Sequence, residues 1–181
     1  MPELQAARGA SLSSLSEPGS TPRSAVGLFA AVAILALALD QVTKVIAVRY
    51  LEGEASIDVI PGLIQFTFLR NPGAALGTGS SMTIVLTIVA IAVSVAVVRI
   101  ATRLRDRVWA LGLGLLLAGA LGNLVDRLFR SPAPLRGEVV DFIDYGPFVG
   151  NVADIALTIA ALLIVWRTFR GIGIDGEREQ S

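Results

Sequence analysis

Two aspartates, Asp141 and Asp154, stand thirteen residues apart in the stretch VVDFIDYGPFVGNVADIAL, residues 139–157. Asp141 lies in a short apolar run typical of a strand, and Asp154 lies one turn into an apolar run long enough for a membrane helix. Two neighbouring carboxylates do not easily both ionise, so one holds the shared proton and the other stays a base. Such a pair titrates as a unit, and it can activate water while it protonates a carbonyl oxygen.

The two acids can meet if the strand folds back over the start of the helix, and Gly146, Pro147 and Gly150 supply the turn. Asp144 is an alternative to Asp141, because it follows three residues later in the same strand. The pleat of a strand would point these two side chains to opposite faces. We therefore expect only one of them to face the helix.

The composition narrows the chemistry that such a site can use. Of the 181 residues, 54% are hydrophobic and the mean hydropathy is +0.70, which indicates an integral membrane protein. The sequence contains no Cys and no His, so it has no thiol nucleophile, no histidine base and none of the usual zinc ligands of these types. We expect no metal and no cofactor. The net charge is zero, so no nucleic-acid partner is indicated.

The apolar runs predict a helical membrane protein that crosses the bilayer four times. The predicted spans are residues 25–48, 81–100, 108–129 and 150–168. A cleavable signal peptide is the alternative interpretation of the first span, but the preceding tail is long for such a segment and further spans follow. The predicted domains are a disordered tail (1–24), a membrane domain (25–170) and a C-terminal tail (171–181).

An arginine-rich loop, residues 99–107, orients the predicted bundle. The positive-inside rule puts this loop and both termini in the cytoplasm, so residues 49–80 and 130–149 face outward. The outer segments have strand character in IDVIPGLIQFTFLRN, which contains a Pro-Gly turn, and again in residues 135–145. We expect an all-α integral membrane fold, a four-transmembrane-helix bundle that carries a small extracytoplasmic sheet.

All four spans bring polar side chains to the same depth, near the outer interface. Besides Asp141 and Asp154, this set comprises Asp40, Lys44, Asn71, Asn123, Asp126, Arg127 and Asn151. Intramembrane ionisable groups are costly and usually face a bundle interior or a cavity. Each residue also has an ordinary explanation: Lys44 can snorkel, Asp126 and Arg127 can pair, and Asn151 can cap the last helix. Their common depth favours a shared site.

Five blocks of the sequence closely resemble the lipoprotein signal peptidase family, also called signal peptidase II. The family's motifs match in order, spacing and four-span topology over about residues 25–170. The matching blocks are DQVTK at 40–44, NPGAALG at 71–77, GALGNLVDR at 119–127, VVDF at 139–142 and GNVAD at 150–154. The chain departs from the family at Gly150, where the family usually has Phe, and in its longer N-terminal tail.

The resemblance implies an aspartic endopeptidase of the bacterial plasma membrane with an extracytoplasmic β-cradle. Such enzymes cut signal peptides from prolipoproteins just before a Cys that already carries a diacylglyceryl group. Their catalytic pair corresponds to Asp141 and Asp154. The residues implied to bind substrate or support this pair are Asp40, Lys44, Asn71, Gly73, Asn123, Asp126, Arg127 and Asn151. The implied partners are prolipoprotein substrates and membrane lipid, and we expect a monomer.

Two other classes of function remain as alternatives. A proton-coupled transporter or channel could use Asp40, Asp126, Asp141 and Asp154 as a relay, but a relay should cross the membrane, whereas these acids lie at one depth. A non-catalytic assembly factor could use the polar cluster to hold its helices together. The catalytic pair Asp141 and Asp154 is called the dyad below. Conversion of either dyad aspartate to Asn distinguishes the assembly factor from the enzyme, because helix contacts tolerate this near-isosteric change whereas an aspartic peptidase does not.

Overall fold

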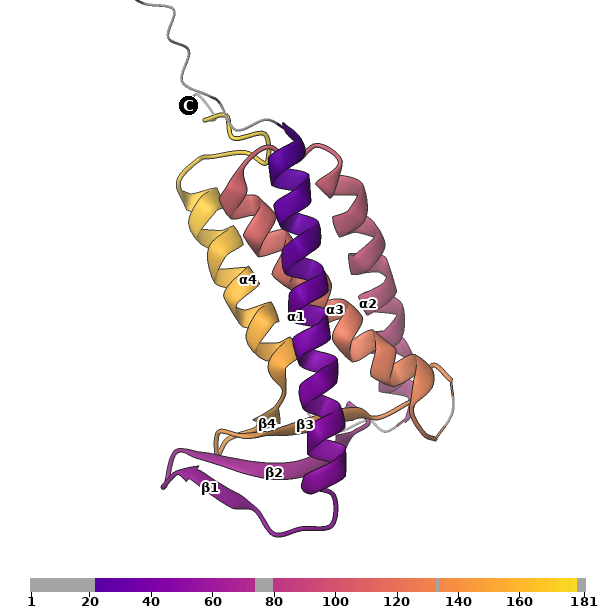
Figure 1. The fold of residues 1–181 in the computed structure, drawn as a ribbon. Coiled ribbons are helices and arrows are strands. Elements are labelled where there is room, and N and C mark those ends of the chain that lie inside the picture. Colours follow the sequence, from indigo (N-terminus) through magenta and orange to yellow (C-terminus); the bar gives the residue numbers. More distant parts are fainter. Residues whose placement is uncertain (1–21, 74–79, 133, 179–181) are drawn as a thin grey trace, which may run out of the picture.

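The computed structural model describes residues 22–73, 80–132 and 134–178, and it confirms four membrane-length helices (Figure 1). The helices are α1 (Pro22–Tyr50), α2 (Ser80–Ala101), α3 (Arg107–Phe129) and α4 (Val152–Phe169). Helix α1 begins three residues earlier than predicted. The first 21 residues of the predicted N-terminal tail lie outside the described part of the chain, so the disorder of that tail stays a prediction.

A four-stranded antiparallel sheet covers one end of the helix bundle (Figure 1). Its strands, in spatial order, are β1 (Ile57–Ile60), β2 (Ile64–Asn71), β3 (Val139–Asp144) and β4 (Val149–Gly150). The first three occur where the sequence predicted strands. The short β4 was not predicted separately, and it pairs with the end of β3 and leads directly into α4.

Helix α3 is the most buried of the four helices, and it contacts each of the others. Small residues allow this close packing, as is usual between membrane helices. An ideal Cβ built on Gly114 would lie 2.9 Å from the carbonyl oxygen of Phe29 in α1. One built on Gly119 would lie 2.7 Å from the carbonyl oxygen of Ala153 in α4. Helices α1 and α4 therefore each approach the backbone of α3 closely at a glycine.

Two apolar clusters enclose a layer of buried polar side chains. The larger cluster joins α1, α2 and α3 around Phe29, Val97 and Leu113, far from the sheet. The smaller cluster packs Val140 and Phe142 of the sheet against the end of α1. The buried charged and amide groups between the two clusters are Asp40, Lys44, Asp126, Asp141 and Asn151.

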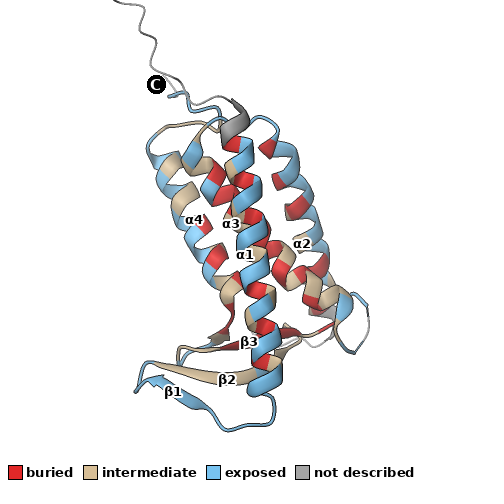
Figure 2. Ribbon diagram, in the orientation of Figure 1, coloured by how far each residue is buried: buried red, intermediate tan, exposed pale blue. Residues whose placement is uncertain are grey.

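The outer faces of the helices are apolar and exposed, as a bilayer requires (Figure 2). At the end away from the sheet, the C-terminal segment lies near the start of α1 (Figure 1). The backbone amides of Arg105 and Asp106 donate to the carbonyl of Ile174, and the Trp109 indole donates to that of Ile172. The predicted C-terminal tail is therefore attached to the α2–α3 loop.

The close contact of α3 with α4 predicts that Gly119→Ala destabilises the bundle. The new methyl group would lie 2.6 Å from Leu157 Cγ and 2.7 Å from the Ala153 carbonyl oxygen, so the helices must separate. We expect a loss of about 1–3 kcal/mol in the free energy of unfolding, measured by denaturation in detergent. The control is Gly27→Ala in α1, where nothing lies within 4 Å of the added methyl. Equal stability of the two variants would contradict this account.

Candidate active site

Asp141 comes from β3 and is 2% exposed. Its Cα partner on the neighbouring strand β2 is Leu69, so Asn71 lies two residues further along the same face. Asn71 Nδ2 donates to Asp141 Oδ2 at 2.7 Å, and Asn151 Nδ2 donates to Asp141 Oδ1 at 2.6 Å. Both carboxyl oxygens of this buried acid are therefore held by amide donors.

Asp154 lies in the first turn of α4, where a capping box orients it. Asn151 is the N-cap residue, and its Oδ1 accepts a hydrogen bond from the backbone amide of Asp154 at 3.1 Å. In return, Asp154 Oδ2 accepts from the backbone amide of Asn151 at 3.0 Å. Asn151 thus contacts both aspartates, one through its side-chain amide group and the other through the cap. The predicted capping role and the predicted site role apply to the same residue.

Three asparagines direct their amide groups at the two carboxylates, and each is oriented by a donor at its oxygen. Asn71 Oδ1 accepts from the backbone amide of Gly73 at 2.8 Å, and Asn151 Oδ1 accepts from the helix amide described above. Asn123 Oδ1 accepts from Lys44 Nζ at 3.0 Å, which turns Asn123 Nδ2 toward Asp154 Oδ1 at 3.1 Å. Because backbone amides and ammonium groups only donate, they leave the asparagine NH2 groups for the carboxylates.

Gly73 allows the turn that orients Asn71. Its φ of +100° is a conformation that side-chain-bearing residues rarely adopt, and an added Cβ would lie 3.0 Å from Leu86 Cδ1. Thr83 in α2 donates to the carbonyl of Pro72 and so ties the same turn to the bundle. The remainder of the NPGAALG block, residues 74–77, lies outside the described residues.

Lys44 is fully buried and does not snorkel. Its ammonium group pairs with Asp40 Oδ2 at 3.0 Å and with Asp126 Oδ2 at 2.9 Å, in addition to Asn123. Asp126 also pairs with Arg130 Nε at 2.6 Å. The ion pair that the sequence suggested between Asp126 and Arg127 is therefore replaced by pairs with Lys44 and Arg130.

Asp40 and Asp126 also accept hydrogen bonds from the backbone beside Asp154 and Asp141, respectively. Asp40 Oδ1 accepts from the amide of Ala153 at 2.9 Å, one residue before Asp154. Asp126 Oδ2 accepts from the amide of Val140 at 3.2 Å, one residue before Asp141. These backbone contacts could not be anticipated from side-chain patterns.

Arg127 approaches the site without a direct hydrogen bond to the dyad among the described contacts. Its Nη1 donates to the Asn123 carbonyl at 3.4 Å, while its buried Nε has no hydrogen-bond partner among the described residues. Its guanidinium lies within electrostatic range of Asp141 and Asp154. It also lines an apolar groove of about 310 Å³ between α2, α3 and α4. Arg127 is thus available to a group that enters this groove.

The two carboxyls have different environments. Burial raises the pKa of Asp141 to about 6; the charge of Asp154 adds to this rise, while hydrogen bonds from Asn71 and Asn151 and the charge of Lys44 oppose it. Asp154 is only half-buried. It lines a second apolar hollow, of about 250 Å³, with Tyr145, Phe148, Ile155, Thr158 and Ile159. Asp141 therefore has the more buried environment, and Asp154 is the carboxylate open to an approaching molecule.

Asp144, the alternative acid, belongs to the turn and not to this cluster. Its Oδ1 accepts from the backbone amide of Gly146 at 2.7 Å. At Gly150, where the sequence departs from the expected motif, an added Cβ would lie 3.3 Å from Phe148 Cε2. The hollow beside Asp154 is lined in part by the aromatic rings of Tyr145 and Phe148.

The structure brings together every residue that the sequence predicted for the site, and it adds others. Arg130 was missed, although its i, i+4 spacing from Asp126 is a usual signal of an ion pair. Gln41 was also missed; its Nε2 donates to Asp40 Oδ2 at 2.9 Å and to the Gly122 carbonyl at 3.2 Å.

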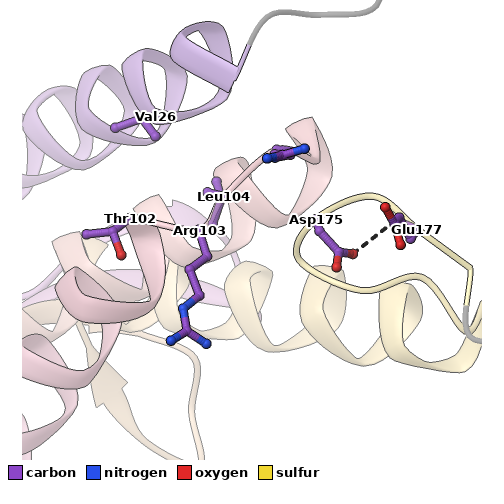
Figure 3. A pocket seen from close by; sticks show the side chains of 7 residues that line it. Val26, Thr102, Arg103, Leu104, Asp175 and Glu177 are labelled. Atoms are coloured by element: carbon purple, nitrogen blue, oxygen red, sulfur yellow. Dashed lines mark hydrogen bonds between the residues drawn. The ribbon is translucent and has the colours of Figure 1, made fainter.

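Another hollow, of about 470 Å³, lies at the end of the bundle away from the sheet, and Figure 3 shows its lining from close by. It is lined by Val26, Thr102, Arg103, Leu104, Arg105, Asp175 and Glu177. Its charges have both signs and belong to the α2–α3 loop and the C-terminal segment. It is remote from the paired carboxylates, so size alone does not identify the reactive site.

Comparisons with known proteins show the family to which the sequence is similar. The family model described as signal peptidase (SPase) II matches residues 32–170. A lipoprotein signal peptidase of Bifidobacterium longum subsp. infantis is 46% identical over 143 residues, which cover 79% of each chain. One of Streptomyces griseus subsp. griseus is 46% identical over 146 residues, covering 80% of this chain and 74% of the relative.

Solved structures agree as well. A bacterial membrane enzyme determined by the in meso method at 2.3 Å resolution is 31% identical and superposes with a TM-score of 0.70, covering 86% of this chain and 94% of its own. A second, at 1.9 Å resolution, is 34% identical, also with a TM-score of 0.70, and covers 80% and 94%. With the match over residues 32–170, these similarities establish that the chain belongs to the signal peptidase II family of peptidases.

Proposed function

We propose that this chain is an aspartic endopeptidase that removes signal peptides from diacylglyceryl-modified prolipoproteins by cutting just before the lipidated Cys. The observation that carries the proposal is the pairing of a fully buried carboxyl, Asp141, with a half-buried one, Asp154, through the single residue Asn151. Family membership supports the substrate class. Residues Asp40, Lys44, Asn71, Gly73, Asn123, Asp126 and Arg127 support the pair or contact substrate.

The different environments suggest the role of each acid. Asp154 accepts a proton from water, and the water oxygen attacks the scissile carbonyl carbon while Asp141 gives its proton to the carbonyl oxygen. The tetrahedral diol then collapses: Asp154 protonates the leaving nitrogen, the C–N bond breaks, and Asp141 recovers its proton from a diol hydroxyl whose oxygen stays on carbon as the new C=O bond. The pair returns to its starting state with one shared proton.

The surrounding grooves suit a substrate that stays in the bilayer. The groove that ends at Asn123 and Arg127 and the hollow that ends at Asp154 are both lined mainly by apolar side chains of membrane helices. A lipid chain and an apolar signal peptide can occupy such surfaces without entering water. Arg127 Nε is then a donor for a substrate carbonyl or an ester oxygen.

The proposed orientation has the sheet and the dyad on the outer side of the plasma membrane and both termini in the cytoplasm. Arg99, Arg103 and Arg105 lie in or beside the α2–α3 loop, at the end of the bundle opposite the sheet (Figure 1). The positive-inside rule assigns that end to the cytoplasm. We propose that the protein works as a monomer without a cofactor.

Asp141→Asn and Asp154→Asn should each reduce cleavage by at least about 100-fold, because each removes a proton-transfer group. The measurement is a gel-shift assay in detergent with a diacylglyceryl-modified prolipoprotein and its unlipidated form as substrates. Wild type should cut only the lipidated form. Full turnover by either folded variant would exclude the dyad mechanism. Equal cleavage of the lipidated and unlipidated substrates by wild type would exclude the dependence on lipid and leave the dyad mechanism intact.

Asp144→Asn should change the cleavage rate by no more than about threefold, as is usual for a substitution away from the site. Its carboxylate accepts only the turn amide of Gly146 among the described contacts, and an Asn oxygen can replace it. This variant is also the matched control for the two dyad variants, because it makes the same chemical change three residues from Asp141. A loss of activity comparable to that of Asp141→Asn would show that the acid role had been assigned to the wrong residue.

The value of kcat/KM should fall as pH rises through about 6. The free enzyme needs Asp141 protonated, and burial raises the pKa of this carboxyl to about 6, so the competent form is complete below that pH and is lost above it. A pH series with the lipidated substrate measures this limb, with Asp144→Asn expected to follow the same curve. A rate that stays constant from pH 5 to about pH 8 would contradict the assignment of Asp141 as the acid.

A further inference from the structure

The ammonium group of Lys44 has three partners inside the protein, although one carboxylate would neutralise it. Nζ lies 3.0 Å from Asp40 Oδ2, 2.9 Å from Asp126 Oδ2 and 3.0 Å from Asn123 Oδ1. These contacts use all three of its protons. Lys44 is 0% exposed, so water does not compete for them.

Each of the three partners reaches a segment that carries a dyad aspartate. Asp40 holds the backbone amide of Ala153, next to Asp154, and Asp126 holds the backbone amide of Val140, next to Asp141. Asn123 donates directly to Asp154 Oδ1 at 3.1 Å. One charged group thus connects α1 and α3 to both the strand and the helix that carry the pair.

We propose that Lys44 is the positioning residue of the dyad: its ammonium group holds Asn123, Asp40 and Asp126 so that they orient the carboxylate of Asp154 and bring the β3 and α4 backbones together. This inference rests on the proposed aspartic mechanism. Lys44 does not touch the reacting atoms and is not a catalytic residue.

Asn123 is the most direct of these connections. Its amide can in principle be rotated so that oxygen and nitrogen exchange places, and then an oxygen would face the Asp154 carboxylate. Lys44 opposes that exchange, because an ammonium group cannot accept a hydrogen bond from the Asn123 nitrogen. Among the described contacts, loss of Lys44 leaves Asn151 Nδ2, 3.2 Å from Asn123 Oδ1, as the one donor that maintains the orientation.

The test uses the charge-compensated double variant Lys44→Met/Asp40→Asn. Lys44→Met alone leaves the buried Asp40 without its ion pair and leaves Asp126 with Arg130 as its paired cation among the described contacts, and such a change can prevent folding. The double variant removes one charge of each sign and leaves an Asn oxygen for the Ala153 amide. We expect it to fold, to lose at least about tenfold in kcat and to keep KM, because the lost hydrogen bonds involve charged groups.

A double-mutant cycle with Asn123→Ala examines the proposed connection. If Lys44 acts mainly through Asn123, the triple variant should have nearly the kcat of Asn123→Ala alone, so the losses should not multiply. The matched control is Arg167→Met, which removes the cation of the Arg167–Asp106 pair at the other end of the bundle. This control should lower stability and leave kcat unchanged.

Three outcomes would overturn the proposal: full kcat in the folded double variant, a loss confined to KM, or losses that multiply in the cycle. Asp154→Asn in the same assay separates this failure from failure of the proposed function. If Asp154→Asn is inactive while Lys44→Met/Asp40→Asn is fully active, only the proposed role of Lys44 is contradicted. If Asp154→Asn is active, the dyad mechanism itself is excluded.

Discussion

A buried ammonium group among carboxylates is the interaction on which the rest of this structure depends. Lys44 cannot reach water, so it needs compensating partners at hydrogen-bond distance, and α1 and α3 must supply them. Those helices can approach closely because α3 has glycines at the contacts; a Cβ on Gly122 would lie 2.5 Å from Asp40 Oδ2. The ion pairs of the polar layer therefore depend on the small residues that let α1 and α3 approach closely.

The sheet adds what a helix bundle alone would lack. It carries Asp141 to the end of α4 from outside the spans and buries this acid, while Asp154, on the helix, stays half-buried. Two carboxyls on one helix would have had similar surroundings, whereas a strand and a helix terminus provide different ones. This difference gives two chemically identical groups unequal exposure, and burial is the main cause of the raised pKa of Asp141.

Much of this arrangement could be predicted from the sequence. Length and hydropathy determine the four spans, because a bilayer core requires a long apolar run for each crossing. The β-prone runs around the Pro-Gly turn predicted β1 and β2, and Val139–Asp144 was expected as a strand. The depth of the polar residues follows from the spans, so their grouping at one level was also predictable, as was the cap formed by Asn151.

The tertiary structure decided how the polar residues pair. Spacing left Asp144 as an alternative to Asp141 and left snorkelling as an ordinary explanation for Lys44. It did not indicate the backbone amides of Val140 and Ala153 as partners. Periodicity reports which face of one element a side chain occupies, but hydrogen bonds between elements depend on their relative rotation and distance. The sequence by itself determined the spans, the strands and the common depth of the acids. Only packing around α3 determined which oxygen meets which donor, because tenths of an ångström decide a hydrogen bond.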